Sequence, residues 1–158
     1  SPGHRAGSTH VTERKRPDHA VTIEQKIGLH HCDPLGVAWH GRYFEWLEAA
    51  RTELFASIGL DVPQIRALGF KMFIVDAHCR YMAPLSYGGT ARITAWFVAT
   101  EPLVRVAYEI HDAGGRWCAR ATTVLATTTA DGSLLPTTPP ELLSRLPLLA
   151  VAGGGPGP

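Results

Sequence analysis

The pattern of apolar and polar positions predicts one long helix near the middle of the chain. Between residues 44 and 58, apolar side chains recur at spacings of three, four and seven, with charged residues between them, at Phe44, Leu47, Leu54, Phe55 and Ile58. This periodicity is typical of an amphipathic helix, and Gly59 is a natural C-terminal stop. Apolar side chains such as Trp46 and Ala50 occupy much of the remaining circumference. We therefore expect the helix to be buried.

The same pattern predicts five strands, one before the helix and four after it. Imperfect alternation over residues 19–29 places Val21 and Ile23 on one side of a first strand. The later strands are runs rich in β-branched and aromatic residues, separated by glycine and proline, at 70–81, 90–100, 104–112 and 117–129. The last two are a predicted hairpin. One helix with five mostly antiparallel strands gives an α+β fold in which the sheet wraps the helix.

Composition limits this fold to one domain. The chain has 158 residues, enough for one hydrophobic core and few for two. Residues 1–18 are polar and irregular, and residues 148–158 are rich in glycine and proline. We expect both segments to be disordered. The domain is then expected over residues 19–147.

Charge and cysteine content exclude several functional classes. A net charge of +1 argues against a nucleic-acid partner, which usually requires a basic face. The chain has no apolar run of transmembrane length, and its N-terminus lacks the apolar core of a signal peptide. We expect no membrane partner and a cytoplasmic location. The three cysteines, Cys32, Cys79 and Cys118, form no Cys-x-x-Cys pair, and reduced thiols are the simplest interpretation.

The segment with the best candidates for catalytic residues directly precedes the helix. Asp33 begins a turn, Asp33-Pro34-Leu35-Gly36, that leads to a helix start near His40 and Gly41. A helix N-terminus has unpaired N–H groups and the positive end of the helix dipole, so it can hold the oxygen of a polarised carbonyl. The turn can direct the carboxylate toward these groups across a gap that an acyl carbonyl would fill, which suits acyl transfer. The alternative is that Asp33 forms an Asx turn or caps the helix.

Other hydrolytic chemistries fit less well. His30, His31, Cys32, Asp33 and His40 include every common zinc ligand type, but adjacent histidines should point to opposite faces of an extended segment, and the chain has no second ligand pair downstream. We predict no metal site. A carboxylate directly beside Cys32 disfavours this thiol as a nucleophile. The chain also lacks the Gly-x-Ser-x-Gly elbow of serine hydrolases.

Residues 32–55 resemble the hot-dog-fold acyl-CoA thioesterases, in the branch of 4-hydroxybenzoyl-CoA thioesterase and the YbgC-like proteins. The family pattern is matched here by Asp33, Gly36, Trp39 and His40, and residues 43–53 resemble the start and middle of its central helix. The resemblance implies a hot-dog fold, in which a five-stranded antiparallel sheet wraps one long central helix. It also implies hydrolysis of a thioester.

The resemblance further implies a role for each motif residue. Asp33 would attack the thioester carbonyl or activate water as a general base, and the sequence does not separate these two mechanisms. The backbone N–H of His40 would hold the thioester oxygen, and its side chain matches a histidine of YbgC-like members. Gly36, Trp39 and Gly41 would support the turn and the oxyanion site.

A second hot-dog branch places its catalytic carboxylate on the central helix. Glu45, Glu48 and Glu53 are therefore alternatives to Asp33, with Glu48 first among them. A simpler interpretation makes each a solvated residue or an ion-pair partner, such as Glu48 with Arg51.

The implied substrate is an acyl-CoA. Release of an acyl or polyketide chain from a carrier-protein phosphopantetheine is the same chemistry with a protein partner, and a non-catalytic acyl-binding protein is the third possibility. No cofactor is implied, and family members form homodimers or homotetramers with the site at a subunit interface. YbgC-like members often have a tyrosine where this chain has Leu29, whereas Cys32-Asp33-Pro34 is closer to the hydroxybenzoyl branch, so neither substrate preference carries over.

The phosphates of CoA require basic side chains at the mouth of the site. Five basic residues of the predicted helix-and-strand region are available, and the sequence does not choose among them: Arg66, Lys71, Arg80, Arg105 and Arg120.

Overall fold

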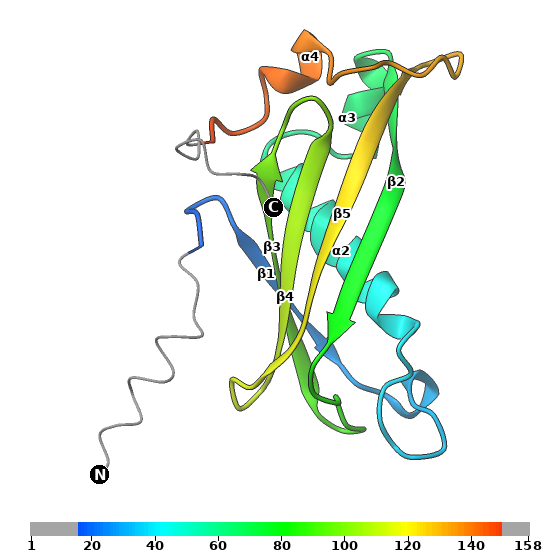
Figure 1. Cartoon of the computed structure of the whole chain (residues 1–158), viewed down its shortest axis with the longest axis vertical. Helices are drawn as coiled ribbons and strands as arrows, with labels where there is room; N and C mark the ends of the chain where they lie inside the picture. The colour runs from blue at the N-terminus through cyan, green and yellow to red at the C-terminus, as the bar shows by residue number, and fades with distance from the viewer. Residues whose placement is uncertain (1–15, 150–158) are drawn as a thin grey trace.

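A single antiparallel sheet and one long helix make up most of the structure, a computed structural model that describes residues 16–149 (Figure 1). The strands lie in the order β1-β3-β4-β5-β2, and helix α2 (Arg42–Ser57) packs across one face. The strands are β1 (Val21–Lys26), β2 (Phe70–Tyr81), β3 (Thr90–Ala99), β4 (Val104–Asp112) and β5 (Trp117–Thr129). The predicted α+β architecture and its five antiparallel strands are confirmed.

Strand alternation gives the sheet two different faces. On β4, Tyr108 points to the helix side, because its hydroxyl accepts a hydrogen bond from Arg51 of α2. The period of two places Val104, Val106 and Ile110 on the same face, and all are fully buried. The intervening residues of β4 therefore face away from α2. The hydrophobic core lies between the sheet and the helix.

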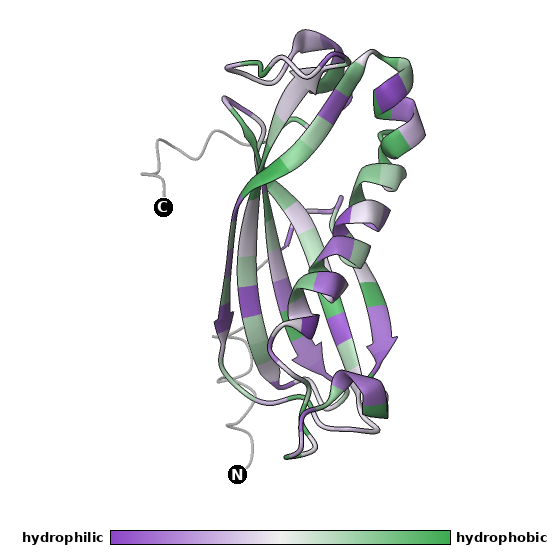
Figure 2. Ribbon diagram, turned by 90° about the vertical axis from the view of Figure 1, so that its right-hand side faces the viewer, coloured by the Kyte–Doolittle hydropathy of each residue, from purple (hydrophilic) through white to green (hydrophobic). Residues whose placement is uncertain are grey.

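Helix α2 lies along one face of the sheet (Figure 2), and the side chains on that side of the helix are the buried ones. Trp46 and Ala50 are buried as expected, together with Tyr43, Leu47, Leu54 and Phe55. The opposite side is exposed, at Phe44, Glu45, Glu48, Ala49, Thr52 and Glu53. The expectation of a buried helix is therefore wrong for half of its circumference in the single chain, because the sheet covers only one side.

The sequence prediction missed three short elements: η1 (Leu29–His31), α3 (Val62–Ala67) and α4 (Pro140–Leu143). Helix α3 had a readable signal, because Asp61 and Gln64 form a capping box. The first strand is also shorter than the expected 19–29. Most of the expected disordered segments, 1–18 and 148–158, lies outside the described residues. Within residues 16–149, no helix has the length and apolar character to cross a membrane.

Candidate active site

Asp33 lies in a tight turn that uses one of its carboxylate oxygens. Oδ1 accepts hydrogen bonds from the N–H groups of Leu35 at 2.9 Å and Val37 at 3.5 Å. This is an Asx turn, and Gly36 has the φ of 81° that favours glycine. Among residues 16–149, no hydrogen bond uses the second oxygen, Oδ2. The carboxylate therefore retains an oxygen for another partner.

The loop that contains this turn is held at both sides by backbone hydrogen bonds. Within the loop, the N–H of Trp39 donates to the carbonyl of His31 at 2.9 Å. Outside it, the N–H of Ala38 donates to the carbonyl of Leu85 at 2.7 Å. These bonds fix the position of Asp33 relative to the start of α2.

Helix α2 begins without a side-chain cap. Its N-cap is Gly41, and within residues 16–149 no side chain accepts a hydrogen bond from the first turn. Among the described hydrogen bonds, none has the N–H of His40 or Gly41 as its donor. The carbonyl of His40 instead accepts a hydrogen bond of 2.9 Å from the hydroxyl of Tyr81 at the end of β2. The helix therefore begins with two available N–H groups at the positive end of its dipole.

Gly41 is required by the packing of Trp39. A Cβ atom at position 41 would lie 2.2 Å from the Trp39 ring, much closer than any real contact. The indole lies against the backbone where the helix begins, and half of its surface is exposed. Any side chain at position 41 would displace this ring.

A pocket of about 310 Å³ opens beside His40. Tyr43 and Tyr81 line it, with ring centroids 4.8 Å apart in an edge-to-face contact. Burial raises the pKa of both tyrosines to about 12, so both hydroxyls are neutral at physiological pH. The rest of the pocket is lined by Ala38, Met82, Ala83 and Pro84. Within one chain, His40 lines this pocket and Asp33 does not.

The helix carboxylates lie apart from this pocket. Glu45 forms an ion pair with Arg42, with a distance of 3.0 Å between nitrogen and oxygen. Glu48 is exposed and lines a different pocket of about 200 Å³ between α2, α3 and β2. The ion pair considered from sequence between Glu48 and Arg51 is absent from residues 16–149. Arg51 instead donates a hydrogen bond of 3.3 Å to the hydroxyl of Tyr108.

The histidines before the turn have structural partners. His30 and His31 lie on the 3-10 turn η1, not on an extended segment, and their ring centroids are 3.9 Å apart. The expectation that they point to opposite faces is therefore wrong. His31 Nδ1 accepts a hydrogen bond from the N–H of Gly28, and burial, with His30 and Arg42 nearby, lowers the pKa of His31. Among residues 16–149, no group of three or more His, Cys, Asp or Glu residues could hold a metal ion.

Tyr81 and Tyr43 are the polar side chains of this pocket that the sequence prediction did not place in the site. Tyr43 lies within residues 43–53, which resembled the family only as part of its central helix. Tyr81 is 41 residues from His40, so no local spacing connects the two. Only the pairing of β2 with β5, which sets the face to which Tyr81 points, could have revealed this contact.

Comparison with known proteins identifies the family that has this sequence and fold. The sequence model of the thioesterase-like superfamily matches residues 27–146. The Synechocystis sp. protein named "Putative esterase sll0410" is 41% identical over 71 residues, which cover 45% of this chain and 43% of that protein. The Bacillus subtilis protein named "Putative acyl-CoA thioesterase YneP" is 28% identical over 105 residues, covering 66% of this chain and 76% of that one.

Solved structures share the fold at low sequence identity. A 4-hydroxybenzoyl-CoA thioesterase mutant complexed with 4-hydroxybenzoyl-CoA has a TM-score of 0.72 and 20% identity, over 82% of this chain and 99% of that chain. The Synechocystis 1,4-dihydroxy-2-naphthoyl-CoA thioesterase has a TM-score of 0.70 and 21% identity, over 80% of this chain and 95% of that chain. These similarities establish a hot-dog fold, as the resemblance of residues 32–55 implied.

Proposed function

Because this chain belongs to the thioesterase-like superfamily, we propose that it hydrolyses the thioester bond of an acyl-CoA to give the free acid and CoA. One observation carries the proposal beyond family membership. The matched region contains one anchored loop that holds both a free carboxylate oxygen, on Asp33, and two unused N–H groups, at His40 and Gly41. A base or nucleophile and an oxyanion site are the minimum for acyl transfer.

In the proposed reaction, the N–H of His40, supported by that of Gly41, binds the thioester carbonyl oxygen. The negative charge that develops on this oxygen is stabilised by the positive end of the α2 dipole. Asp33 either attacks the carbonyl carbon, giving a mixed anhydride that water hydrolyses, or removes a proton from the attacking water. By either route the carbon–sulfur bond breaks, the acyl group gains oxygen from water, and the sulfur leaves as the thiol of CoA.

The other motif residues would position these groups. Gly36 allows the turn that directs the Asp33 carboxylate, and Trp39 packs against Gly41 where the helix begins. Tyr81 holds the carbonyl of His40, which orients the peptide plane between His40 and Gly41. Since this plane contains the N–H of Gly41, the Tyr81 hydrogen bond supports the proposed oxyanion site.

We further propose that the active unit is a homodimer formed through β2. This strand is one of the two edge strands of the sheet and pairs only with β5, so one row of its backbone groups has no strand partner among residues 16–149. Phe73 and Val75 on this edge are 44% and 46% exposed. Antiparallel pairing of two β2 strands would bury them and would bring the second chain next to Tyr81, and so next to His40. A tetramer would add a second interface to this dimer.

The test is release of free thiol from a panel of aromatic, short-chain and long-chain acyl-CoAs, by the wild type and by Asp33→Asn. We expect the wild type to release thiol and Asp33→Asn to release none. The fold of the variant and its mass in solution should be the same as those of the wild type. Turnover that survives in Asp33→Asn would contradict the role of Asp33, and Glu48→Gln would then be measured. If only acyl groups on a carrier-protein phosphopantetheine are hydrolysed, the substrate is an acyl carrier protein and not an acyl-CoA. If no thioester is hydrolysed, the proposal is contradicted.

A further inference from the structure

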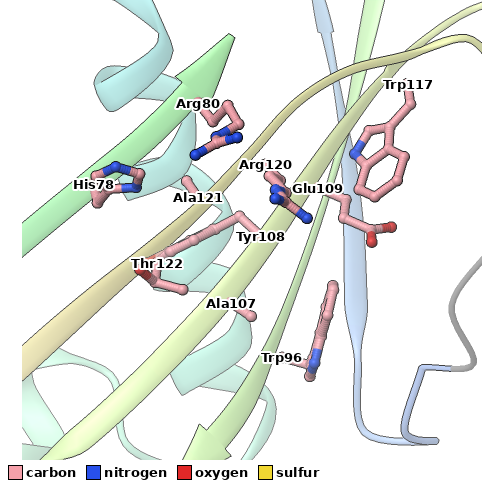
Figure 3. A pocket seen from close by; sticks show the side chains of 10 residues that line it. All are labelled: His78, Arg80, Trp96, Ala107, Tyr108, Glu109, Trp117, Arg120, Ala121 and Thr122. Atoms are coloured by element: carbon pink, nitrogen blue, oxygen red, sulfur yellow. The ribbon is translucent and has the colours of Figure 1, made fainter. Parts of the chain in front are cut away.

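A second pocket, of about 420 Å³, lies on the face of the sheet opposite α2 (Figure 3). Its polar and aromatic lining comes from four strands: His78 and Arg80 of β2, Trp117 and Arg120 of β5, Glu109 of β4 and Trp96 of β3. The two arginines are exposed, and Figure 3 shows both side chains on the side of the strands away from the helix. This pocket contains no residue of the proposed active site.

Strand register places positive charges next to each other here. Arg80 of β2 is directly opposite Arg120 of β5, and Arg120 is directly opposite Glu109 of β4. Like charges at directly opposed positions destabilise a sheet. Neither arginine belongs to an ion pair among residues 16–149, although Arg120 lies 5.9 Å from the centre of the Trp117 ring. The fold therefore maintains two adjacent guanidinium groups without a carboxylate between them.

Glu109 is the one carboxylate in the lining, and Arg16 neutralises it. Glu109 is 4% exposed and forms an ion pair with Arg16, whose guanidinium lies 5.9 Å from the centre of the Trp96 ring. Arg120, although directly opposite Glu109 in the sheet, does not form this pair. Because Arg16 balances the charge of Glu109, the charges of Arg80 and Arg120 remain uncompensated.

We propose that this pocket binds a phosphate monoester, held between the guanidinium groups of Arg80 and Arg120. A phosphate monoester has a charge of about −1.5 to −2 at neutral pH, which matches two guanidinium groups. Arginine is well suited to the task, because its planar group can donate two parallel hydrogen bonds to phosphate oxygens. The pocket volume falls in the range of about 300 to 1,000 Å³ that is usual for small-molecule sites. The ligand is therefore a phosphate on a larger organic group, such as a phosphorylated nucleoside.

Two sources could provide this phosphate. The first is the phosphorylated adenosine end of a CoA substrate, which rests on the proposed function. Arg80 directly precedes Tyr81, whose hydroxyl contacts His40, so the two sites meet at the end of β2 on opposite faces of the sheet. The second source is a free nucleotide that binds independently of the substrate. Arg80 and Arg120, two of the five basic residues considered from sequence, line this same pocket.

The first experiment is calorimetric titration of the full chain with adenosine 3′,5′-bisphosphate, with adenosine as the ligand control. We expect binding of the bisphosphate only, weakened about tenfold by Arg80→Gln and again by Arg120→Gln, since each removes a charge-assisted hydrogen bond. Arg105→Gln is the matched variant control. Arg105 lies on the same face of β4 as Glu109, outside the pocket lining, and its removal should leave binding unchanged.

Failure of the bisphosphate to bind the wild type would overturn the proposal. Undiminished binding in the Arg80→Gln/Arg120→Gln double variant, with its thermal unfolding unchanged, would overturn it as well, and so would equal weakening by Arg105→Gln. These titrations need no catalytic activity, so they stand even if no thioester is hydrolysed.

Kinetics then identify the source of the phosphate. If it belongs to the substrate, the bisphosphate competes with acyl-CoA, and Arg80→Gln raises KM about tenfold with kcat unchanged. The same variant should leave KM unchanged for the matching ester of dephospho-CoA, which lacks the 3′-phosphate. If the ligand is a separate nucleotide, the bisphosphate binds without competition and KM for acyl-CoA stays constant. Either pattern supports a phosphate site at Arg80 and Arg120.

Discussion

Two turns of this protein are built almost identically but have different surroundings. In the first, Asp33 Oδ1 accepts hydrogen bonds from the N–H groups two and four residues later, and in the second Asp112 Oδ1 does the same. Each turn also contains a glycine with positive φ, Gly36 at 81° and Gly115 at 89°. The local chemistry of an Asx turn therefore does not distinguish a candidate catalytic aspartate from a structural one.

The two turns differ in the element to which each one leads. The Asp112 turn connects β4 to β5 and leads only into the sheet. The Asp33 turn leads to the start of α2, where N–H groups are unused and a pocket lined by Tyr43 and Tyr81 opens. The proposed catalytic role of Asp33 therefore depends on the helix start beside it and not on the turn itself. This difference can be tested one feature at a time.

The largest expected effect is that of amide substitution in the two turns. Asp33→Asn should lower kcat by a factor of about 10² to 10⁴, because an amide cannot serve as base or nucleophile. Asp112→Asn, which makes the same change in the matched turn, should leave kcat unchanged. Steady-state hydrolysis of the best acyl-CoA measures both. Equal activity of the two variants would remove the proposed distinction between the turns.

The next effect concerns the helix start, which only the first turn has. Gly41→Ala would place a Cβ 2.2 Å from the Trp39 ring, and the displacement should cost about 1 to 3 kcal/mol of stability and lower activity. At Gly114, beside Asp112, an added Cβ would lie 3.5 Å from the nearest atom, so Gly114→Ala should be tolerated. Denaturant unfolding measures both variants.

Removal of the ring tests the cause of the Gly41→Ala defect. In a Trp39→Ala background, Gly41→Ala should destabilise the protein by less than it does in the wild type. An undiminished loss of stability there would show that the ring is not what requires glycine at position 41.

A smaller effect should be shared by the two turns. Asp33→Ala and Asp112→Ala each remove the acceptor of two turn hydrogen bonds, and each should lower the free energy of unfolding by about 1 kcal/mol. The asparagine variants retain an oxygen at the same place and should lose less. Thermal unfolding of all four variants separates the turn role of each aspartate from its chemical role. A much larger loss at one turn would show that their structural roles differ.

The smallest effect is a pH dependence of stability from the pocket beside the first turn. Burial raises the pKa of Tyr43 from 10.0 to about 12 in the folded protein. Between these values the unfolded chain loses the proton while the folded chain keeps it, so stability is full below about pH 10 and declines as pH rises toward 12. Tyr43→Phe should flatten this decline in the thermal unfolding midpoint between pH 9 and 11. An unchanged slope would contradict the assignment to Tyr43.

The sequence by itself determined most of the local structure. The periodicity of residues 44–58 identified α2, and the β-rich runs identified four strands with bounds within one residue of those observed. These features are readable because helix and strand periods depend on neighbours in the chain. Asp33, Gly36, Trp39 and His40 were recognised because the motif is contiguous.

Only the tertiary structure decided which distant residues meet. The Tyr81 hydroxyl contacts the His40 carbonyl, and Arg80 opposes Arg120, because β2 pairs with β5 in one particular register. The exposed side of α2 likewise depends on how much of the helix one sheet can cover. A shift of one residue along a strand sends every side chain to the other face, so strand pairing, which no local pattern specifies, assigns Tyr81 to one proposed site and Arg80 to the other.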